Sequence, residues 1–416
     1  MKKILIGTSA LVGAGLIAGQ AVAADGIKLS VGGFFRTAYL LNFDDNRGYG
    51  SSYRGAEGHD RNIDGLYSDA EIHFKGETTL DNGVTVGVRV ELEGEEDDND
   101  QIDEAYTYFK GGFGELRIGS DDEALAANCV TPPGSTANFG AFSPNQVGAA
   151  YVQALGFTGS NTVCTGVEGD ANKFVYFSPT FAGFQLALSY TPDAQAQAYN
   201  SDADDFNNTG GPHIGQNGQD LGDRSHDFSA YLTYNYEGDG FGVTWGGGAS
   251  FSGRVENGGN ATLYHDGSVS NSQDTGTDAY QTGLNVSFGG FKVGAAFQYF
   301  DLNAGDANSW VVGTGVSYNV DAWTVGFQYS HQQANGLRNS EFGTTFIDDV
   351  DRSADRFVLT GIYNFGPGID IEAELGYTTT ESDDRYSGIG NPVHERGGPG
   401  NDYDAFEIGV GTAITF

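Results

Sequence analysis

Apolar and polar residues alternate along most of this chain, in runs of about ten residues that polar breaks separate. Successive side chains of a β-strand point to opposite faces, so this two-residue period predicts strands with two different faces. Sixteen such runs are present: 28–42, 66–80, 84–94, 101–110, 114–120, 171–181, 184–192, 227–237, 241–252, 279–288, 291–301, 309–319, 322–332, 355–365, 369–380 and 403–416. The pattern therefore predicts an all-β protein.

The breaks between these runs alternate in length. After even-numbered runs they are two or three residues long, as at Asp81-Asn82-Gly83 and Gly289-Gly290, which is typical of tight turns. After most odd-numbered runs they are long and polar, as at 43–65, 121–170 and 193–226. An up-and-down meander places every second connection at the same end. We therefore predict a transmembrane antiparallel β-barrel of about 16 strands, with short turns at one end and long loops at the other.

The two faces of the runs differ in chemistry. In the last run, Phe406, Ile408 and Val410 share one face, whereas Ala405 and Glu407 share the other. A carboxylate buried without a partner costs on the order of several kcal/mol, but a hydrated interior accepts it. We therefore predict that lipid contacts the apolar face and that the polar face lines a water channel. The acids expected on the channel side are Glu71, Glu91, Glu372, Glu374 and Glu407.

Residues 1–24 differ from the rest of the chain. Lys2 and Lys3 precede an uncharged stretch of apolar and small residues, and residues 21–24 are small. This pattern predicts a signal peptide that is cleaved after Ala23 or Ala24, leaving residues 25–416 as the barrel. A membrane anchor is the alternative, but the stretch is short for the ~20 residues that span a bilayer.

The chain is strongly acidic. Its 56 acidic and 20 basic residues give a net charge of −36, which becomes −38 when residues 1–24 and their two lysines are removed. Such a charge argues against nucleic acid as a partner and favours cations. The sequence also contains no Gly-x-Ser-x-Gly elbow and no phosphate-binding lysine loop, so we expect neither enzymatic activity nor a cofactor.

Two further features lie in the predicted loops. Cys129 and Cys164 are the only cysteines, and because an exported protein meets an oxidising compartment we predict a disulfide between them, with two free thiols as the alternative. The second loop has the density of oxygen ligands expected of a weak calcium site, although it lacks the spacing of an EF-hand. Its candidate ligands are Glu95, Asp97, Asp98 and Asp100; a solvated acidic loop is the alternative.

Two segments carry a resemblance to a known family. The final run, Ala405–Phe416, resembles the terminal strand of porins, and the segment from Gly111 to Gly119 resembles the turn and strand that lead into their third loop. The chain thus resembles the general diffusion porins of Gram-negative bacteria, nearest to the alphaproteobacterial type. The resemblance implies a homotrimer in the outer membrane, in contact with lipid and lipopolysaccharide. It also implies that barrel-assembly machinery reads the terminal Phe416, and that small hydrophilic solutes and ions diffuse passively through the pore.

The same resemblance implies that the third loop, residues 121–170, folds into the lumen and places acids opposite a basic wall. The loop acids carried over by position are Asp121, Asp122, Glu123 and Glu168. Strand parity points four bases inward, namely Arg36, Lys75, Arg89 and Arg117. Opposed charges across a narrow waist would create a transverse field that favours polar solutes. The alternative is that these residues are ordinary solvated side chains of the lumen.

Four functions compete at this stage. The first is a general channel with a preference for cations, which follows from the acidic lumen. The second is a substrate-specific channel, which would need aromatic side chains inside the lumen, and parity offers only Tyr231 and Phe300. The third is an outer-membrane adhesin or hydrolase built on a smaller barrel, and the fourth is a soluble, calcium-stabilised β-protein.

Overall fold

The structure is a computed structural model that describes eleven ranges of the chain: 26–44, 63–94, 102–135, 163–193, 225–253, 262–263, 269–270, 277–301, 308–335, 352–382 and 403–416. The predicted signal peptide and the candidate calcium ligands Glu95, Asp97, Asp98 and Asp100 lie outside these ranges. Among the described residues, no helix is long and apolar enough to cross a lipid bilayer.

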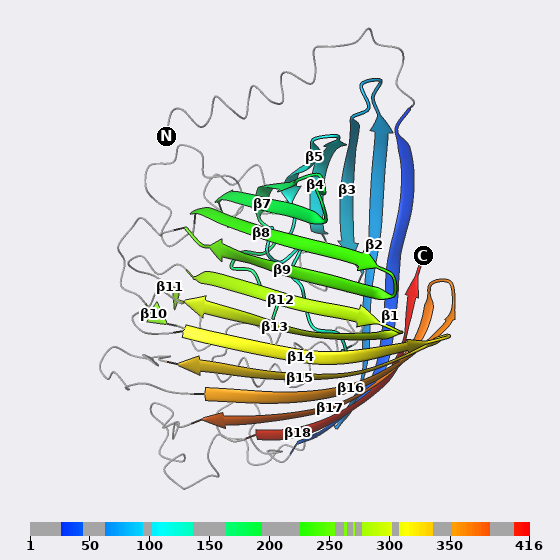
Figure 1. The fold of residues 1–416 in the computed structure, drawn as a ribbon, viewed down its shortest axis with the longest axis vertical. Helices are drawn as coiled ribbons and strands as arrows, with labels where there is room; N and C mark the ends of the chain where they lie inside the picture. The colour runs from blue at the N-terminus through cyan, green and yellow to red at the C-terminus, as the bar shows by residue number, and fades with distance from the viewer. Residues whose placement is uncertain are drawn as a thin grey trace.

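Sixteen strands of the described chain form one closed barrel in which every neighbouring pair is antiparallel (Figure 1). Each barrel strand pairs with the barrel strands that precede and follow it in sequence, β9 with β12 included, and β1 pairs with β18 to close the ring. The strands are β1 (Lys28–Asp44), β2 (Asp64–Thr79), β3 (Thr85–Glu93), β4 (Ile102–Gly111), β5 (Gly114–Ser120), β6 (Asn172–Phe177), β7 (Phe184–Asp193), β8 (Ser225–Gly238), β9 (Phe241–Phe251), β12 (Asp278–Phe288), β13 (Phe291–Asp301), β14 (Asn308–Val320), β15 (Trp323–Asn335), β16 (Arg352–Gly366), β17 (Ile369–Ser382) and β18 (Tyr403–Thr415).

The predicted antiparallel barrel of 16 strands is confirmed, and most strand ends agree with the alternating runs to within three residues. The sequence pattern missed two short strands, β10 (Thr262–Leu263) and β11 (Val269–Ser270), which pair with each other outside the barrel. Strands of two residues are too short to establish a period. The strand predicted at 171–181 is shorter in the structure, where β6 ends at Phe177.

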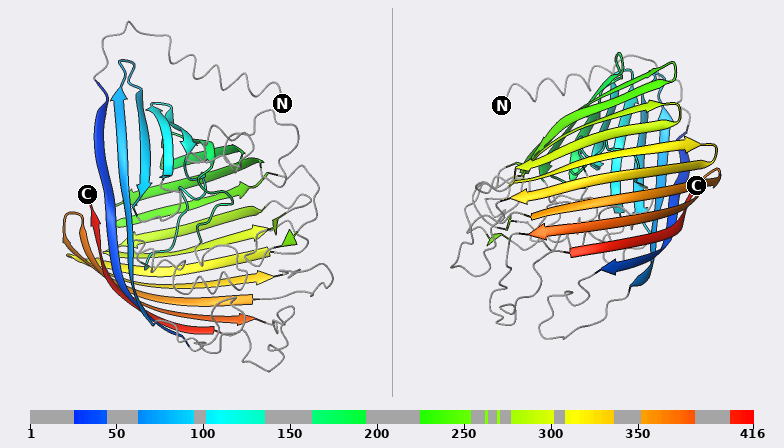
Figure 2. Two further views of the ribbon diagram at one scale, coloured as in Figure 1. Left: turned by 180° about the vertical axis from the view of Figure 1, so that it is seen from behind. Right: turned by 60° about the horizontal axis from the view of Figure 1, so that its bottom comes forward.

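Tight turns join the strands at one end of the barrel (Figure 2). Gly289 and Gly290 both have positive φ, of 54° and 86°, and they connect β12 to β13. Two consecutive positive φ angles give a turn whose twist matches that of the flanking strands, and glycine adopts them without steric cost. The short breaks in the sequence are therefore the hairpin turns that the pattern predicted.

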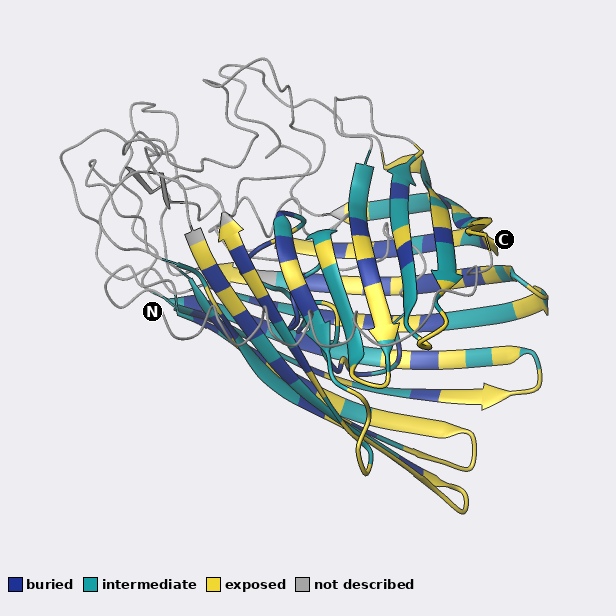
Figure 3. Ribbon diagram, turned by 90° about the horizontal axis from the view of Figure 1, so that it is seen from above, coloured by how far each residue is buried: buried dark blue, intermediate teal, exposed yellow. Residues whose placement is uncertain are grey.

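The wall of the barrel has an apolar outer face and a polar or small inner face, as the alternation predicted. Along β18, Phe406 and Val410 are 42% and 52% exposed, whereas Ala405 and Glu407, on the opposite face, are buried. A similar banding of buried and exposed residues runs along several other strands, such as β12 and β17 (Figure 3). Exposed apolar residues in this number would be unfavourable in water, so the outer face is suited to lipid.

The two ends of the described chain meet where the barrel closes. The backbone N–H of Phe416 donates to the carbonyl oxygen of Gly33 at 3.0 Å, and the N–H of Gly33 donates to the carbonyl oxygen of Phe416 at 3.1 Å. The closed ring leaves no unpaired strand edge, which a lipid environment requires of a β-structure.

Candidate functional site

Between β5 and β6 the chain leaves the wall of the barrel, and its described parts contact the inner face of other strands (Figure 2). We call residues 121–135 and 163–171 the loop stem; together they are the described parts of the predicted third loop and its last connection to β6. The site is built from the loop stem, from the inner side chains that bind it and from the charged inner side chains of β1–β5.

The first turn of the loop stem is bound by serines of β7 and β8. The backbone N–H of Ala124 donates to Ser189 Oγ at 3.0 Å, and that of Leu125 donates to Ser229 Oγ at 2.9 Å. All four residues are buried. Because buried backbone donors need partners, these small inward hydroxyl groups fix the path of the loop stem against the wall.

A tyrosine and a glutamine hold both backbone polar atoms of Val130. The N–H of Val130 donates to the hydroxyl oxygen of Tyr231 at 3.0 Å, and Gln281 Nε2 donates to the carbonyl oxygen of Val130 at 2.9 Å. The Tyr231 hydroxyl in turn donates to Gln281 Oε1. This closed network spans β8 and β12 and leaves none of these polar atoms without a partner.

Tyr231 therefore has a different role from the one that a substrate-specific channel would require. It faces inward as predicted, but it is 1% exposed and holds the loop stem. Phe300 is also inward and 4% exposed, in an apolar cluster with Leu125 and Val167 of the loop stem. Neither ring lines an open lumen, because the loop stem covers both.

The loop stem continues across the barrel as far as β16. Asn285 Nδ2 on β12 donates to the carbonyl oxygen of Thr131 at 2.9 Å, and the Thr360 hydroxyl on β16 donates to the carbonyl oxygen of Gly134 at 3.0 Å. On the return segment, the N–H of Thr165 donates to Gln298 Oε1 on β13 at 3.0 Å. The loop stem thus covers inner-face residues on strands from β7 to β16.

Inner-face glycines allow the backbone of the loop stem to lie directly on the wall. A Cβ atom at Gly315 of β14 would overlap the carbonyl oxygen of Pro133, and one at Gly283 of β12 would overlap that of Val130. At Gly326 of β15 it would lie 2.6 Å from the Cα of Gly134. Any larger residue at these positions would push the loop stem away from the wall.

The two arms of the loop stem are also joined to each other. Cys129 and Cys164 form a disulfide with their Cα atoms 5.7 Å apart. At the root of the loop, the Nζ atom of Lys173 donates to the carbonyl oxygens of Asp121 and Gly169 and pairs with Glu168 Oε2 at 3.1 Å. Lys173 lies on β6 and its side chain is fully buried. Its contacts therefore tie both arms of the loop stem to β6.

Glu123 links the same two arms to β9. Its Oε1 atom accepts the N–H of Val167 at 2.8 Å, and its Oε2 atom accepts the hydroxyl of Ser250 at 2.5 Å. Burial raises the pKa of Glu123 to about 7, although these two hydrogen bonds lower it. Burial likewise raises the pKa of Asp121 to about 6, against the lowering effect of Arg117 and Lys173.

These raised pKa values predict that the loop stem is held less firmly at higher pH. A carboxyl group whose pKa is raised in the folded state stabilises that state below its ordinary pKa, and the stabilisation is lost as the pH rises through the raised value. For Glu123 the window runs from 4.5 to about 7. We expect a phosphine reductant to cleave the Cys129–Cys164 disulfide several-fold faster at pH 8 than at pH 5, since detachment exposes it.

The control for this experiment is Glu123→Gln, which keeps a hydrogen-bonding side chain but cannot ionise. In this variant the reduction rate should change much less between pH 5 and pH 8. An equal pH dependence in the variant and the wild type would show that Glu123 does not control the attachment.

The candidate loop acids lie mostly in the seam between the loop stem and the wall. Asp121, Glu123 and Glu168 are 1%, 1% and 7% exposed, and only Asp122 is partly exposed. The sequence predicted that all four acids face a basic wall across the pore, but Asp121, Glu123 and Glu168 are buried and do not face open solvent. Asp121 contacts Arg117 and Glu168 contacts Lys173, both a few residues away in sequence, whereas Glu123 accepts the hydroxyl of Ser250 on the distant strand β9.

The four predicted bases lie on neighbouring strands, and each is paired with an acid on the same wall. Arg36 contacts Asp69 at 3.1 Å, and Lys75 contacts Glu77 at 3.0 Å. Arg89 pairs with Glu91.

Among the described residues, Arg117 is the only one of the four bases that contacts a loop acid. It contacts Glu115 at 2.7 Å and Asp121 at 3.3 Å. Acidic and basic side chains therefore alternate on this side of the barrel. We call the following four pairs the ion-pair wall: Arg36–Asp69, Lys75–Glu77, Arg89–Glu91 and Arg117–Glu115.

The predicted lumen acids of β17 and β18 are inward but buried. Glu372, Glu374 and Glu407 are 0%, 2% and 3% exposed, so the expectation that water solvates them freely is not met. Arg356 on β16, itself buried, lies 3.5 Å from Glu374 and 3.0 Å from Glu407 and compensates part of their charge. Sequence reasoning missed Arg356, although its parity with Val358 and Thr360 already points it inward.

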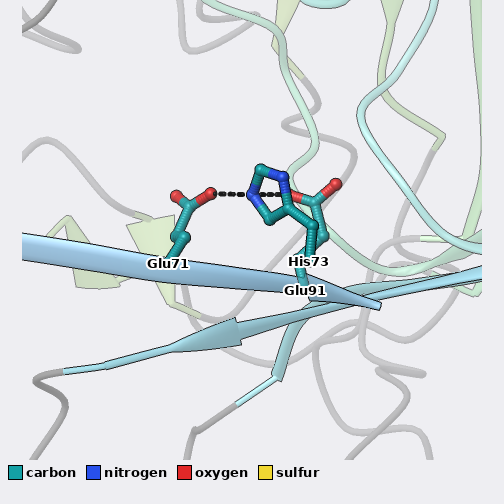
Figure 4. A group of neighbouring side chains, drawn as sticks. All are labelled: Glu71, His73 and Glu91. Atoms are coloured by element: carbon teal, nitrogen blue, oxygen red, sulfur yellow. Dashed lines mark hydrogen bonds and ion pairs between the residues drawn. The ribbon is translucent and has the colours of Figure 1, made fainter. Parts of the chain in front are cut away.

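The remaining predicted lumen acids, Glu71 and Glu91, meet at a histidine (Figure 4). His73 Nε2 lies 2.7 Å from Glu71 Oε2 and 3.3 Å from Glu91 Oε2. His73 lies inside the predicted run 66–80, but its proximity to Glu91 depends on the pairing of β2 with β3. The sequence alone did not reveal this group.

Comparisons with known proteins agree with this architecture. Residues 7–383 match a family described as Gram-negative porin. A monosaccharide porin from a Halomonas species is 23% identical over 418 residues, covering 92% of this chain and 97% of the relative.

Two solved structures show the similarity of fold. An anion-selective porin from Comamonas acidovorans has a TM-score of 0.55 and 16% identity, with 94% of this chain and 100% of that chain covered. The trimer form of OmpT, an outer membrane protein of Vibrio cholerae, has a TM-score of 0.53 and 14% identity at the same coverage.

Proposed function

The chain belongs to the Gram-negative porin family, and from this we propose that it forms a passive, water-filled channel for small hydrophilic solutes and ions. As a member of this family it is an outer-membrane porin, a channel rather than an enzyme. The observation that carries the proposal is a closed barrel of 16 strands with an apolar outer face and a polar inner face. Barrels of this size enclose an aqueous passage.

We assign the narrowest part of this channel to the space between the loop stem and the ion-pair wall. The loop stem covers the inner face from β7 to β16, while the bases of the ion-pair wall lie on β1, β2, β3 and β5. These bases are between a fifth and a half exposed, whereas the acids Asp121 and Glu123 are sealed. Solutes would therefore meet alternating charges along one wall, together with the partly exposed Asp122.

We further propose that the channel prefers cations. Acids outnumber bases by 36 over the whole chain, and the bases of the ion-pair wall are already compensated by neighbouring carboxylates. An excess of negative charge near the pore raises the local concentration of cations.

The preference predicts the sign of a reversal potential. With a tenfold KCl gradient across a planar bilayer, the zero-current potential should have the sign given by K⁺ flow toward the dilute side. The expected potential falls as the salt concentration rises, because salt screens the charges. A potential of the opposite sign would contradict the preference while leaving the channel intact.

Liposome swelling tests the transport function itself. Vesicles that contain the refolded mature protein should swell in isotonic solutions of small sugars and amino acids, at rates that fall with solute size and show no saturation. Protein-free vesicles provide the control. Folded protein that leaves the vesicles impermeable would contradict the proposal.

A sugar-specific channel is the second candidate, favoured by the printed name of the Halomonas relative. Such a channel should show current that a monosaccharide blocks in a concentration-dependent way. Against it stands the burial of Tyr231 and Phe300, the two aromatic rings that sequence parity offered for stacking on a sugar.

Assembly and export complete the proposal. We propose that the chain forms a homotrimer, for which the trimeric form of the Vibrio cholerae protein and the family resemblance are the support. We also propose that residues 1–24 are removed on export, that lipid and lipopolysaccharide surround the barrel and that assembly machinery reads Phe416. Loop-bound calcium at Glu95, Asp97, Asp98 and Asp100 remains a proposal as well.

A further inference from the structure

We propose that Glu71, His73 and Glu91 form a binding site for a divalent transition-metal ion, with Zn²⁺ as the best match, on the inner wall of the barrel. The site goes beyond the proposed transport function, because it would bind an ion rather than only let it pass. Glu71 and His73 are two residues apart on β2 and therefore share a face, and Glu91 pairs directly with His73 from β3 (Figure 4).

The ligand atoms already lie close to the positions that a metal requires. One nitrogen or oxygen atom from each of the three side chains lies within 4.8 Å of the other two. Tetrahedral Zn²⁺ with bonds of about 2.1 Å holds its ligand atoms about 3.4 Å apart. The separation of 3.3 Å between His73 Nε2 and Glu91 Oε2 matches this value, and the 2.7 Å separation between His73 Nε2 and Glu71 Oε2 needs only a small side-chain rotation.

Arg89 orients two of the ligands. A guanidinium group can only donate, so the 3.4 Å contact of Arg89 Nη2 with His73 Nδ1 makes Nδ1 an acceptor and places the imidazole proton on Nε2. A Zn²⁺ ion on Nε2 requires the ring proton on Nδ1 instead, so metal binding would shift the imidazole to its other tautomer and move Arg89 Nη2 out of this long contact. Arg89 also pairs with Glu91 Oε1, which leaves Glu91 Oε2 directed at the imidazole.

The surrounding charge favours a divalent cation despite Arg89. Glu71 also belongs to a second group, with Glu93 and Asp103, whose ligand atoms again lie within 4.8 Å of one another. In the described part of the chain these are the two groups of three or more such side chains that meet this distance, and they share Glu71. Four carboxylates therefore surround one guanidinium and one imidazole.

The presence of the histidine selects the class of metal. Calcium and magnesium prefer ligand sets made only of oxygen, whereas imidazole nitrogen combined with carboxylate suits zinc and its neighbours in the first transition row. Three protein ligands would leave a fourth coordination position for water. Because Glu91 is 5% exposed whereas Glu71 and His73 are partly exposed, an ion would enter from the side of Glu71 and His73.

Calorimetric titration of the untagged mature protein with ZnCl₂ tests the site directly. In detergent, the wild type should bind one Zn²⁺ per chain, and both His73→Ala and Glu91→Gln should weaken binding roughly tenfold or more. His331→Ala is the matched control: His331 also pairs with a carboxylate, Asp355, at 2.8 Å, and its loss should leave Zn²⁺ binding unchanged. When CaCl₂ replaces ZnCl₂, the wild type and His73→Ala should bind the ion equally well.

The outcomes separate this inference from the proposed function, because binding is measured without any current. Absence of Zn²⁺ binding by the folded wild type, or binding that survives both His73→Ala and Glu91→Gln, would overturn the site. Circular dichroism establishes that each variant is folded, and two independent ligand variants guard against the failure of one. Binding by a protein that does not conduct would keep the site and remove the channel.

Discussion

A Gly315→Val variant is expected to conduct less current per pore than the wild type, by roughly twofold or more, because the displaced loop stem would enter the free passage, whose width sets conductance. Gly315 faces inward on β14, and a Cβ atom there would overlap the carbonyl oxygen of Pro133. The wall is a continuous hydrogen-bonded sheet, whereas the loop stem is held by individual hydrogen bonds, so the loop stem is the part that should move. Single-channel recording in planar bilayers measures the effect.

Gly361→Val is the matched control for this substitution. Gly361 lies on β16, and a Cβ atom there would meet nothing within 4 Å. The control should keep the wild-type conductance and the wild-type rate of disulfide reduction. Equal conductance of Gly315→Val and Gly361→Val, with both proteins folded, would show that the loop stem does not narrow the pore.

A Lys173→Met variant is expected to release the root of the loop. It would leave the carboxylate of Glu168 buried without its base and remove a donor from the carbonyl oxygens of Asp121 and Gly169. Removing one partner of a buried ion pair costs about 3–5 kcal/mol, because the other charge remains desolvated. We expect faster proteolysis within the loop and a noisier, larger single-channel current.

Two further variants interpret the result. Lys292→Met removes an exposed lysine of β13 and should behave as the wild type. The double variant of Lys173→Met with Glu168→Gln removes the buried charge together with its partner, so it should recover much of the lost protection from protease. If Lys173→Met resists protease as well as Lys292→Met does, the charge network at the loop root is not what holds the loop stem.

The strands and their facing could be predicted from the sequence because both depend on short-range alternation. The assignment of Ala405 and Glu407 to the inner face and of Phe406 to the outer face needed only the two-residue period. The pattern was ambiguous where polar and aromatic residues mix, as at Tyr106-Thr107-Tyr108-Phe109. There the structure buries the two tyrosines inside and exposes Phe109 at 36%.

The contacts of the loop stem could not be predicted because they join residues far apart through a path without a period. Ser250 and Glu123 are separated by 127 residues, and Thr360 and Gly134 by 226. Parity pointed Tyr231 inward, but it could not say that a loop would occupy the space in front of the ring. The sequence likewise could not show that Asp121, Glu123 and Glu168 are buried between the loop stem and the wall, where they hold the loop.

The proposed metal site could be predicted in part. The two-residue period alone places Glu71 and His73 on the same face of their strand. The third ligand, Glu91, requires the register of β2 against β3, and a shift of one residue would have pointed it at lipid. Inner-face acids and histidines on consecutive strands are thus a signal worth testing wherever a hairpin register can be fixed.

Single-channel recording of the refolded mature protein is the most direct test of a hydrated passage through this barrel. The account predicts discrete current steps of uniform size, with a conductance that rises in proportion to salt concentration at high ionic strength. Folded protein that inserts into the bilayer and yields no current steps, at any voltage or salt concentration tried, would contradict it.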